Sequence, residues 1–592
     1  MKKKFLQLLV FFITLSAYSQ GDKLVTFYEK SGFKATPSYD ETVAYCKLLD
    51  EASESIYYTT FGSSPQGRDL PLLIIDSDGL NDPASVNNAG KLVVLIQAGI
   101  HPGEIDGKDA GFMFFRDLVI LKKLGKLPEN LTFLFIPVMN VDGHERFGPY
   151  SRINQDGPEQ MGWRTTAQNL NLNRDFLKAD APEMQAWLRL YQQWKPGFVA
   201  DIHVTDGADY QYVMTYGLET HGNMDEGLTA WTNGYFIPEM ESHMEKAGYP
   251  AGPYVMFRRW HDPRSGLRSG AAGPRYSTGY MATRNRICLL VENHSLKNYK
   301  TRVSSTYELL KFLTDYLDKN AFKIKILNAA ADKYAVSDAF RARPFALSYK
   351  AGPDSIFVDF KGVEYDVEKS DLTGGDWFRY HPDKPVTFKV PLFHQQIPAA
   401  TVLIPEAYII PPEWNEIIDR LELHGVQYYR LEKPADIKIE SYRFTKTDFS
   451  KTSFEGRIQV TPTFEAFNEV RQFPAGSVVI PTDQVAVRAI VHMLEPGSPD
   501  SFLQWGFLNG IFELKEYFET YVMEEYARKM IAENPALKEE FNKWKAENPE
   551  ASQSQWSQLE WFYFRSPYLD RKWNVYPIGR ILEKSKLEEL GL

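Results

Sequence analysis

The chain contains little cysteine: only Cys46 and Cys288 among 592 residues. This count excludes a metal site built from cysteine. Cys288 lies in the apolar run RICLLVE, which is typical of a buried strand, where free cysteine is common. We therefore expect two unpaired thiols, and a disulfide is the alternative that an oxidising compartment permits.

Long basic segments are also absent. Beyond the first four residues there is no extended run of Lys and Arg, and the formal net charge is −10. Nucleic-acid binding needs a positive surface to meet the phosphates, so we expect no nucleic-acid partner. Strict repeats and low-complexity segments are missing too. A globular chain of this length predicts two or three domains.

The N-terminal apolar stretch is too short to be a membrane span. It begins at Phe5, follows three lysines and precedes small residues at Ala17 and Ser19. A spanning helix needs about 20 apolar residues, and this pattern is typical of a secretory signal peptide. We expect residues 1–19 to be removed, leaving a periplasmic or secreted chain with no membrane span. An uncleaved anchor is the alternative.

The first half of the chain alternates between two kinds of pattern. In residues 24–320, amphipathic stretches separate short apolar runs, which are PLLIID, LVVLIQAGI, LTFLFIPVMN, FVADIHV and RICLLVEN. Buried parallel strands have such continuous apolar runs, and helices connect them. The pattern predicts an α/β domain with a mixed, mostly parallel sheet covered by helices.

The pattern changes after residue 320. Residues 321–400 contain segments that alternate with a period of two and lack helices between them, namely DSIFVDF, VEYDV and PVTFKVPLF. This predicts a small β-rich module. Residues 401–592 mix strand-like and helix-like stretches, and we expect an α/β C-terminal region of unknown role.

Polar side chains occur at the ends of several predicted strands. His101 and Glu104 follow one strand, His203 lies near the end of another and Glu292 ends a third. A His-x-x-acid pair alone is a weak signal, because one is expected by chance, and His101 by itself suits a surface loop. However, ligands bind at the carboxyl ends of strands in open α/β sheets. Two imidazoles and one carboxylate form the ligand set of a catalytic zinc site.

Six motifs in order resemble one known family. They are HPGE, NVDG, GWR, LNRDF, DIH and LLVEN, spread over roughly residues 25–315. Their order and spacing resemble the zinc carboxypeptidase family, of the carboxypeptidase A and B type. The sequence looks like an exported bacterial member with a C-terminal extension, which matches no catalytic pattern.

The resemblance implies a metal centre and a proton carrier. One zinc ion per chain would be held by His101, Glu104 and His203. Glu292 would be the general base that activates water and then the acid that protonates the leaving amine. A strand-end carboxylate paired with an arginine, Arg284 or Arg286, is the alternative for Glu292.

The resemblance also implies a substrate-binding group. Arg164 would polarise the scissile carbonyl and stabilise the oxyanion. Asn173 and Arg174 would bind the terminal carboxylate, because a guanidinium donates two parallel hydrogen bonds to one carboxylate. The alternative for Arg174 is an ordinary ion pair with Asp175.

The sequence departs from the family at two places. Family members often carry an arginine just before the glutamate ligand, where this chain has Gly103, so one anion contact is missing. The family's mobile tyrosine has no clear counterpart, and Tyr276 and Tyr280 are the candidates. Neither place identifies the residue that determines side-chain specificity.

The function implied is hydrolysis of the C-terminal amide bond of peptides outside the cytoplasm. The partner would be a peptide with a free C-terminal carboxylate. Two alternatives stay open: a zinc amidase of the same fold acting on a non-standard amide, such as a cell-wall peptide, and a catalytically inactive peptide-binding protein.

Overall fold

The computed structural model describes residues 24–591. The predicted signal peptide, residues 1–19, lies outside the described residues. Among the residues described, no helix has both the length and the apolar character needed to cross a bilayer.

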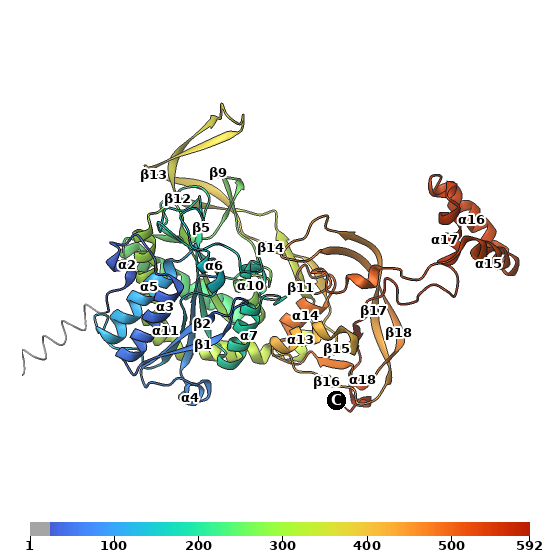
Figure 1. Ribbon diagram of the computed structural model, residues 1–592, viewed down its shortest axis with the longest axis horizontal. Helices are drawn as coiled ribbons and strands as arrows, with labels where there is room; N and C mark the ends of the chain where they lie inside the picture. Colours follow the sequence, from blue (N-terminus) through green and yellow to red (C-terminus); the bar gives the residue numbers. More distant parts are fainter. Residues whose placement is uncertain (1–23, 592) are drawn as a thin grey trace, which may run out of the picture.

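An eight-stranded sheet forms the centre of the first half (Figure 1). In spatial order its strands are β1 (Ile56–Ser63), β2 (Asp69–Asp76), β4 (Leu131–Ile136), β3 (Leu92–Ala98), β5 (Phe198–Thr205), β10 (Ile287–His294), β6 (Met214–Gly217) and β7 (Ala251–Pro253). The four central strands, β4, β3, β5 and β10, run parallel. Strand β1 pairs antiparallel with β2, β2 with β4, and β6 with β10, whereas β7 pairs parallel with β6. The predicted mixed, mostly parallel sheet is confirmed.

Both faces of this sheet are covered. Every residue of β3 and β5 is buried, which explains why their sequences are mostly apolar. One face packs against α3 (Tyr39–Ala52), α5 (Asp106–Phe115), α9 (Ile237–Lys246) and α11 (Tyr299–Ala335). The other face packs against α7 (Pro182–Trp194) and α10 (Ser277–Thr283), and also against α13 (Asn415–Leu423) and α14 (Val487–Leu494) of the C-terminal half.

The two cysteines are buried and free. Cys46 belongs to the hydrophobic core on the first face of the sheet, and Cys288 belongs to the core on the second face. The sheet therefore separates the two thiols.

Helix α11 crosses the boundary expected at residue 320. It runs without interruption from Tyr299 to Ala335 and buries apolar side chains against the sheet along its length. Its side chains remain buried beyond residue 320, at Ala321, Ile324 and Ala331. The change in sequence pattern near residue 320 therefore falls within a continuous helix.

A long hairpin follows this helix and projects from the body (Figure 1). It consists of β12 (Ile356–Lys369) and β13 (Asp376–Phe393), and its base pairs with β9 (Asp262–Arg268), which pairs in turn with β8 (Met256–Arg259). A two-stranded sheet of β11 (Phe345–Ala351) and β14 (Gln396–Val402) joins the hairpin to the rest. The β-rich segment is thus attached to the first half through the pairing of β13 with β9.

The C-terminal half is built around a six-stranded sheet. In spatial order its strands are β16 (Tyr429–Arg430), β19 (Val478–Pro481), β15 (Ala407–Ile410), β20 (Gly579–Ile581), β17 (Ala435–Phe449) and β18 (Val460–Phe473). Its helices α13 and α14 share one hydrophobic core with α7 and the central sheet. The two halves are therefore joined by apolar packing.

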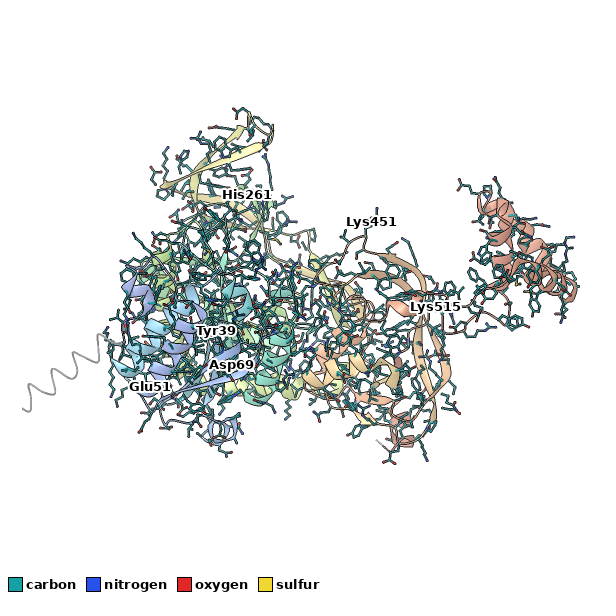
Figure 2. The ribbon with its side chains drawn as sticks, viewed as in Figure 1. Tyr39, Glu51, Asp69, His261, Lys451 and Lys515 are labelled. Carbon is teal, nitrogen blue, oxygen red and sulfur yellow. The ribbon has the colours of Figure 1, made fainter. Side chains whose placement is uncertain are left out.

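A cluster of three helices lies apart from both sheets (Figure 1). It contains α15 (Thr520–Glu533), α16 (Ala536–Glu547) and α17 (Gln555–Tyr563), which pack around a small core of their own. Lys515 marks the start of the segment that leads to it (Figure 2).

The shared core predicts that the two halves unfold together. Leu421 of α13 is fully buried in that core, and Leu421→Ala should destabilise the protein by about 2–5 kcal/mol because it leaves a cavity. Leu582→Ala, at a side chain that is 46% exposed, should change stability by less than about 0.5 kcal/mol.

The reactivity of the two buried thiols measures whether the two halves unfold together. In a denaturant titration, Leu421→Ala should make Cys46 and Cys288 reactive toward a thiol reagent at the same, lower concentration. Unchanged protection of Cys46 would show that the N-terminal half unfolds independently of the C-terminal half.

Candidate active site

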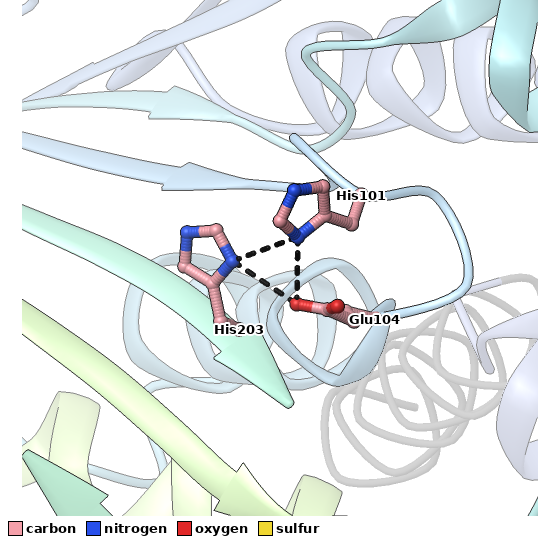
Figure 3. Close-up of side chains that lie close together, drawn as sticks. All are labelled: His101, Glu104 and His203. Carbon is pink, nitrogen blue, oxygen red and sulfur yellow. Dashed lines mark hydrogen bonds and ion pairs between the residues drawn. The ribbon is translucent and has the colours of Figure 1, made fainter. Parts of the chain in front are cut away.

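Three side chains from neighbouring strands meet at the carboxyl end of the central sheet (Figure 3). His101 and Glu104 lie just after β3, and His203 lies near the end of β5. The distance from His203 Nδ1 is 3.3 Å to His101 Nδ1 and 3.0 Å to Glu104 Oε2, and the third side of the triangle is 3.1 Å. All three residues are buried.

This triangle fits a zinc ion. Zinc bonds to nitrogen and oxygen of about 2.0–2.2 Å in tetrahedral geometry place two ligand atoms roughly 3.3 Å apart. The three observed distances lie close to that value. Two imidazoles and a carboxylate also match zinc in chemical type, and three protein ligands leave one position for substrate or water.

The two histidines are held in orientation by their second ring nitrogens. His101 Nε2 lies 2.9 Å from Asn171 Oδ1, and His203 Nε2 lies 3.0 Å from Asp201 Oδ2. A polar partner of this kind fixes the tautomer that presents Nδ1 to the metal. Asn171 is itself held from the C-terminal half, because its backbone N–H donates to Glu455 Oε2 at 2.7 Å.

Glu104 is fixed at both oxygens. Oε2 completes the triangle and accepts the backbone N–H of Val204 at 3.1 Å. Oε1 accepts hydrogen bonds from Arg152 at 2.6 Å and from Arg164 at 3.1 Å. Although burial opposes ionisation, His101 and Arg152 hold the pKa of Glu104 well below its ordinary value.

The glycine before Glu104 explains how Arg152 reaches it. A Cβ atom on Gly103 would overlap the Arg152 side chain. Arg152 thus occupies the space that a side chain at 103 would fill. Its guanidinium donates to Glu104 from another segment of the chain.

Glu292 faces the same cavity from β10. In the parallel pairing of β10 with β5, Glu292 lies directly opposite His203. Burial raises the pKa of Glu292 to about 8, with Glu104 adding to the rise and His203 opposing it. A divalent cation beside this carboxyl would lower that pKa.

The expected alternative for Glu292 is not observed. Arg286 pairs with Asp332 at 2.8 Å, and Arg284 lies over the ring of Tyr191. Neither arginine is therefore the partner of Glu292, which leaves its carboxylate directed to the cavity.

Arg174 and Asn173 line the cavity beside the metal ligands. Arg174 lies over the ring of Tyr276 at 4.7 Å and donates a hydrogen bond to the carbonyl oxygen of Asn173. Asp175, its expected alternative partner, is paired with Lys178. Within residues 24–591 Arg174 forms no ion pair, so its guanidinium is free to donate hydrogen bonds to a substrate carboxylate.

The two tyrosine candidates have different environments. Tyr276 lines the cavity, whereas Tyr280 is fully buried between the two halves, where its hydroxyl lies 2.9 Å from His424 Nδ1. Tyr280 therefore cannot contact substrate, and Tyr276 is the one placed to do so.

The cavity has a volume of about 710 Å³, which is large enough for a peptide end. Arg152 and Tyr254 also line it, and sequence reasoning did not identify them. Burial and nearby Glu292 raise the pKa of Tyr254 to about 12, so its hydroxyl stays protonated and can donate a hydrogen bond. Asp201 lies two residues before His203 on the same face of the strand, so the motif DIH could have identified it. No sequence motif pointed to Arg152.

Comparison with known proteins agrees with this site. Residues 42–230 match the family model described as zinc carboxypeptidase. That range contains the three triangle residues and the cavity arginines, and it ends before Glu292.

Individual relatives extend the similarity beyond this range. Carboxypeptidase 2 from Trichophyton rubrum is 24% identical over 494 residues, which cover 80% of this chain and 84% of that protein. Probable carboxypeptidase 2 from Trichophyton verrucosum (strain HKI 0517) is 23% identical over 76% of this chain and 83% of that protein. Among solved structures, carboxypeptidase A from Helicoverpa armigera is 19% identical, with a TM-score of 0.36, and the match covers 51% of this chain and 75% of that one.

Residues 42–230 are thus similar to the zinc carboxypeptidase family, and the similarity to curated carboxypeptidases supports a peptide hydrolase. The family implies zinc, and the cluster of His101, Glu104 and His203 offers the ligands for it.

The cluster predicts a metal-binding test. His203→Ala should reduce zinc content measured by elemental analysis after dialysis, because two protein ligands bind zinc far more weakly than three. His381→Ala, on the projecting hairpin, should leave zinc content unchanged. Equal zinc in both variants would exclude His203 as a ligand.

Proposed function

We propose that this protein is a zinc-dependent metallocarboxypeptidase that removes the C-terminal residue of peptides outside the cytoplasm, with one zinc ion per chain. The observation that carries the proposal is the placement of three groups in one cavity. They are the ligand triangle, the carboxylate of Glu292 and the unpaired guanidinium of Arg174.

The metal would be held by His101, Glu104 and His203. When bound there, zinc supplies Lewis acidity that polarises the scissile carbonyl and activates water as the nucleophile. Asn171 and Asp201 hold the two imidazoles in orientation, and Arg152 holds the glutamate.

Glu292 moves the proton. Its carboxylate accepts a proton from the attacking water and then donates it to the nitrogen of the leaving amine. The role requires a carboxyl close to the ligands that is not itself a ligand, and Glu292 meets this requirement because it lies opposite His203 on the next strand. Arg164 lines the cavity and donates to the developing oxyanion.

Arg174 and Asn173 select the C-terminal end of the substrate peptide. The guanidinium binds the terminal carboxylate, which sets the scissile bond one residue away from the free end. Asn173 lines the cavity, and its side-chain NH2 group would donate to the same carboxylate.

The same geometry bears on two alternative functions. A complete ligand triangle with Glu292 beside it favours a hydrolase over an inactive peptide-binding protein. A non-standard amide, such as one in a cell-wall peptide, is the second candidate substrate, because a free carboxylate at Arg174 suits it equally. Export rests on the N-terminal pattern of residues 1–19.

Replacement of the proton carrier tests the mechanism. Glu292→Gln keeps the shape of the side chain but cannot accept a proton, so kcat should fall by at least about 100-fold while zinc content stays at the wild-type level. Both quantities are measured on the same preparation. Glu239→Gln, at an exposed carboxylate of α9, is the matched control and should keep wild-type kcat. A Glu292→Gln enzyme with near-normal kcat would remove Glu292 from the reaction.

The contact between Arg174 and the terminal carboxylate of the substrate is tested by a double cycle. One change is made in the enzyme, at Arg174, and the other is made at the C-terminus of the substrate. Amidation of the substrate's C-terminus leaves Arg174 without a partner, which typically costs about 2–5 kcal/mol, or roughly 30-fold to several thousand-fold in kcat/KM. Arg174→Ala should harm the free-acid substrate by a similar factor.

Arg174→Ala should scarcely change hydrolysis of the amidated substrate, because the two changes delete the same interaction. If wild-type enzyme cleaves amidated and free peptides equally, it is not a carboxypeptidase, although it remains a metal-dependent hydrolase.

A further inference from the structure

A second cavity lies between the two halves of the chain and contains none of the metal ligands. It has a volume of about 200 Å³ and shares no lining residue with the active-site cavity. Its walls come from residues 222–226 of the first half, from residues 334–349, where α11 leads into β11, and from α14 of the C-terminal half. No step of the proposed reaction uses this cavity.

Arg488 of α14 brings a buried positive charge into this cavity. The residue is only 7% exposed, and its guanidinium lies over the ring of Phe340 at 4.6 Å. Its Nη1 donates one long hydrogen bond of 3.4 Å to the carbonyl oxygen of Asn223, whereas Nε is buried with no hydrogen-bond partner. Within residues 24–591 no carboxylate forms an ion pair with Arg488. A buried charge without a partner is costly, so this guanidinium lacks an acceptor.

Two acidic residues near Arg488 are engaged elsewhere. Glu226 lines the same cavity, but its side chain is 85% exposed and pairs with Arg343 at 3.3 Å. Asp225 accepts two backbone N–H groups at the start of α8 (Glu226–Trp231). Burial lowers the pKa of Arg488, and Asp225 opposes that fall only in part. A guanidinium nevertheless stays charged at neutral pH, so the cavity keeps its positive charge.

The other walls of the cavity are mostly apolar. They include the side chains of Phe340, Pro344, Phe345, Tyr349 and Pro398. These side chains offer contact area to a hydrocarbon group, and aromatic rings among them can pack against another ring. A ligand that suits this cavity therefore combines an anionic end with an apolar body.

The arrangement favours a carboxylate over a phosphate. A carboxylate carries one charge, and its two oxygens match two parallel N–H donors of one guanidinium. A phosphate group carries more than one charge at neutral pH and has more acceptor oxygens, so it needs more donors than Arg488 alone supplies. Arg343, the other arginine that lines the cavity, is engaged with Glu226 and with the hydroxyl of Tyr334, at 2.9 Å.

We infer that the second cavity is a binding site for a small organic carboxylate. The carboxylate group pairs with the guanidinium of Arg488, and the apolar or aromatic body packs against Phe340, Phe345 and Tyr349. The pairing supplies the acceptor that Arg488 lacks. The site is separate from the active-site cavity, so the inference does not depend on the proposed function.

Titration calorimetry with benzoate and its neutral analogue benzamide tests the charge. Because the guanidinium of Arg174 can also bind a carboxylate, the titrations use the Arg174→Ala protein. We expect benzoate to bind at least about 10-fold more tightly than benzamide, as for hydrogen bonds to a charged group. Equal binding of the two compounds would overturn the inference, and so would tighter binding of inorganic phosphate than of benzoate.

Substitutions in the Arg174→Ala protein then assign the binding to this cavity. Arg488→Met keeps an apolar stem but removes the charge, so the preference for benzoate over benzamide should disappear. Arg528→Met, at a side chain of α15 that is 77% exposed, is the matched control and should keep the preference. Ala346→Phe narrows the cavity without changing its charge and should weaken benzoate binding at least about 10-fold. Thermal unfolding shows which variants are folded, and full benzoate binding by either folded cavity variant would overturn the inference.

Discussion

The active site depends on the register of adjacent parallel strands. His203 on β5 and Glu292 on β10 lie opposite each other, and β3 ends beside them at the same edge of the sheet. A slip of one residue would turn each side chain to the opposite face, and a slip of two would move it about 7 Å. Apolar packing on both faces of the sheet fixes this register, because any slip would expose or misplace fully buried side chains.

The same packing places several charges where water is scarce, and the site compensates by pairing them. Both oxygens of Glu104 accept hydrogen bonds or lie against the histidines, and Asp201 lies behind His203. Buried charges are tolerated when each has a partner of opposite sign or a hydrogen bond. Within residues 24–591 the guanidinium of Arg174 forms no ion pair, so it stands out as a group that can bind a ligand.

The sequence predicts those parts of the site that follow from strand patterns. Apolar runs located the central strands, and the polar residues at their ends, His101, Glu104 and His203, do come together. Arg152 was not predictable, because its position depends on the path of a long loop and on the space left by Gly103. The boundary expected at residue 320 falls inside helix α11, which runs without interruption from Tyr299 to Ala335, and a change in sequence pattern does not reveal that continuity.

The contact between Glu455 and Asn171 has a consequence for how the enzyme is made. The two residues lie 284 positions apart, and Asn171 orients His101. During synthesis the catalytic half emerges first, without the acceptor that holds Asn171 and without half of the core on one face of the sheet. A chain that lacks Glu455 therefore lacks this hydrogen bond to Asn171, the residue that contacts His101. The orientation of His101 thus draws on both halves of the chain.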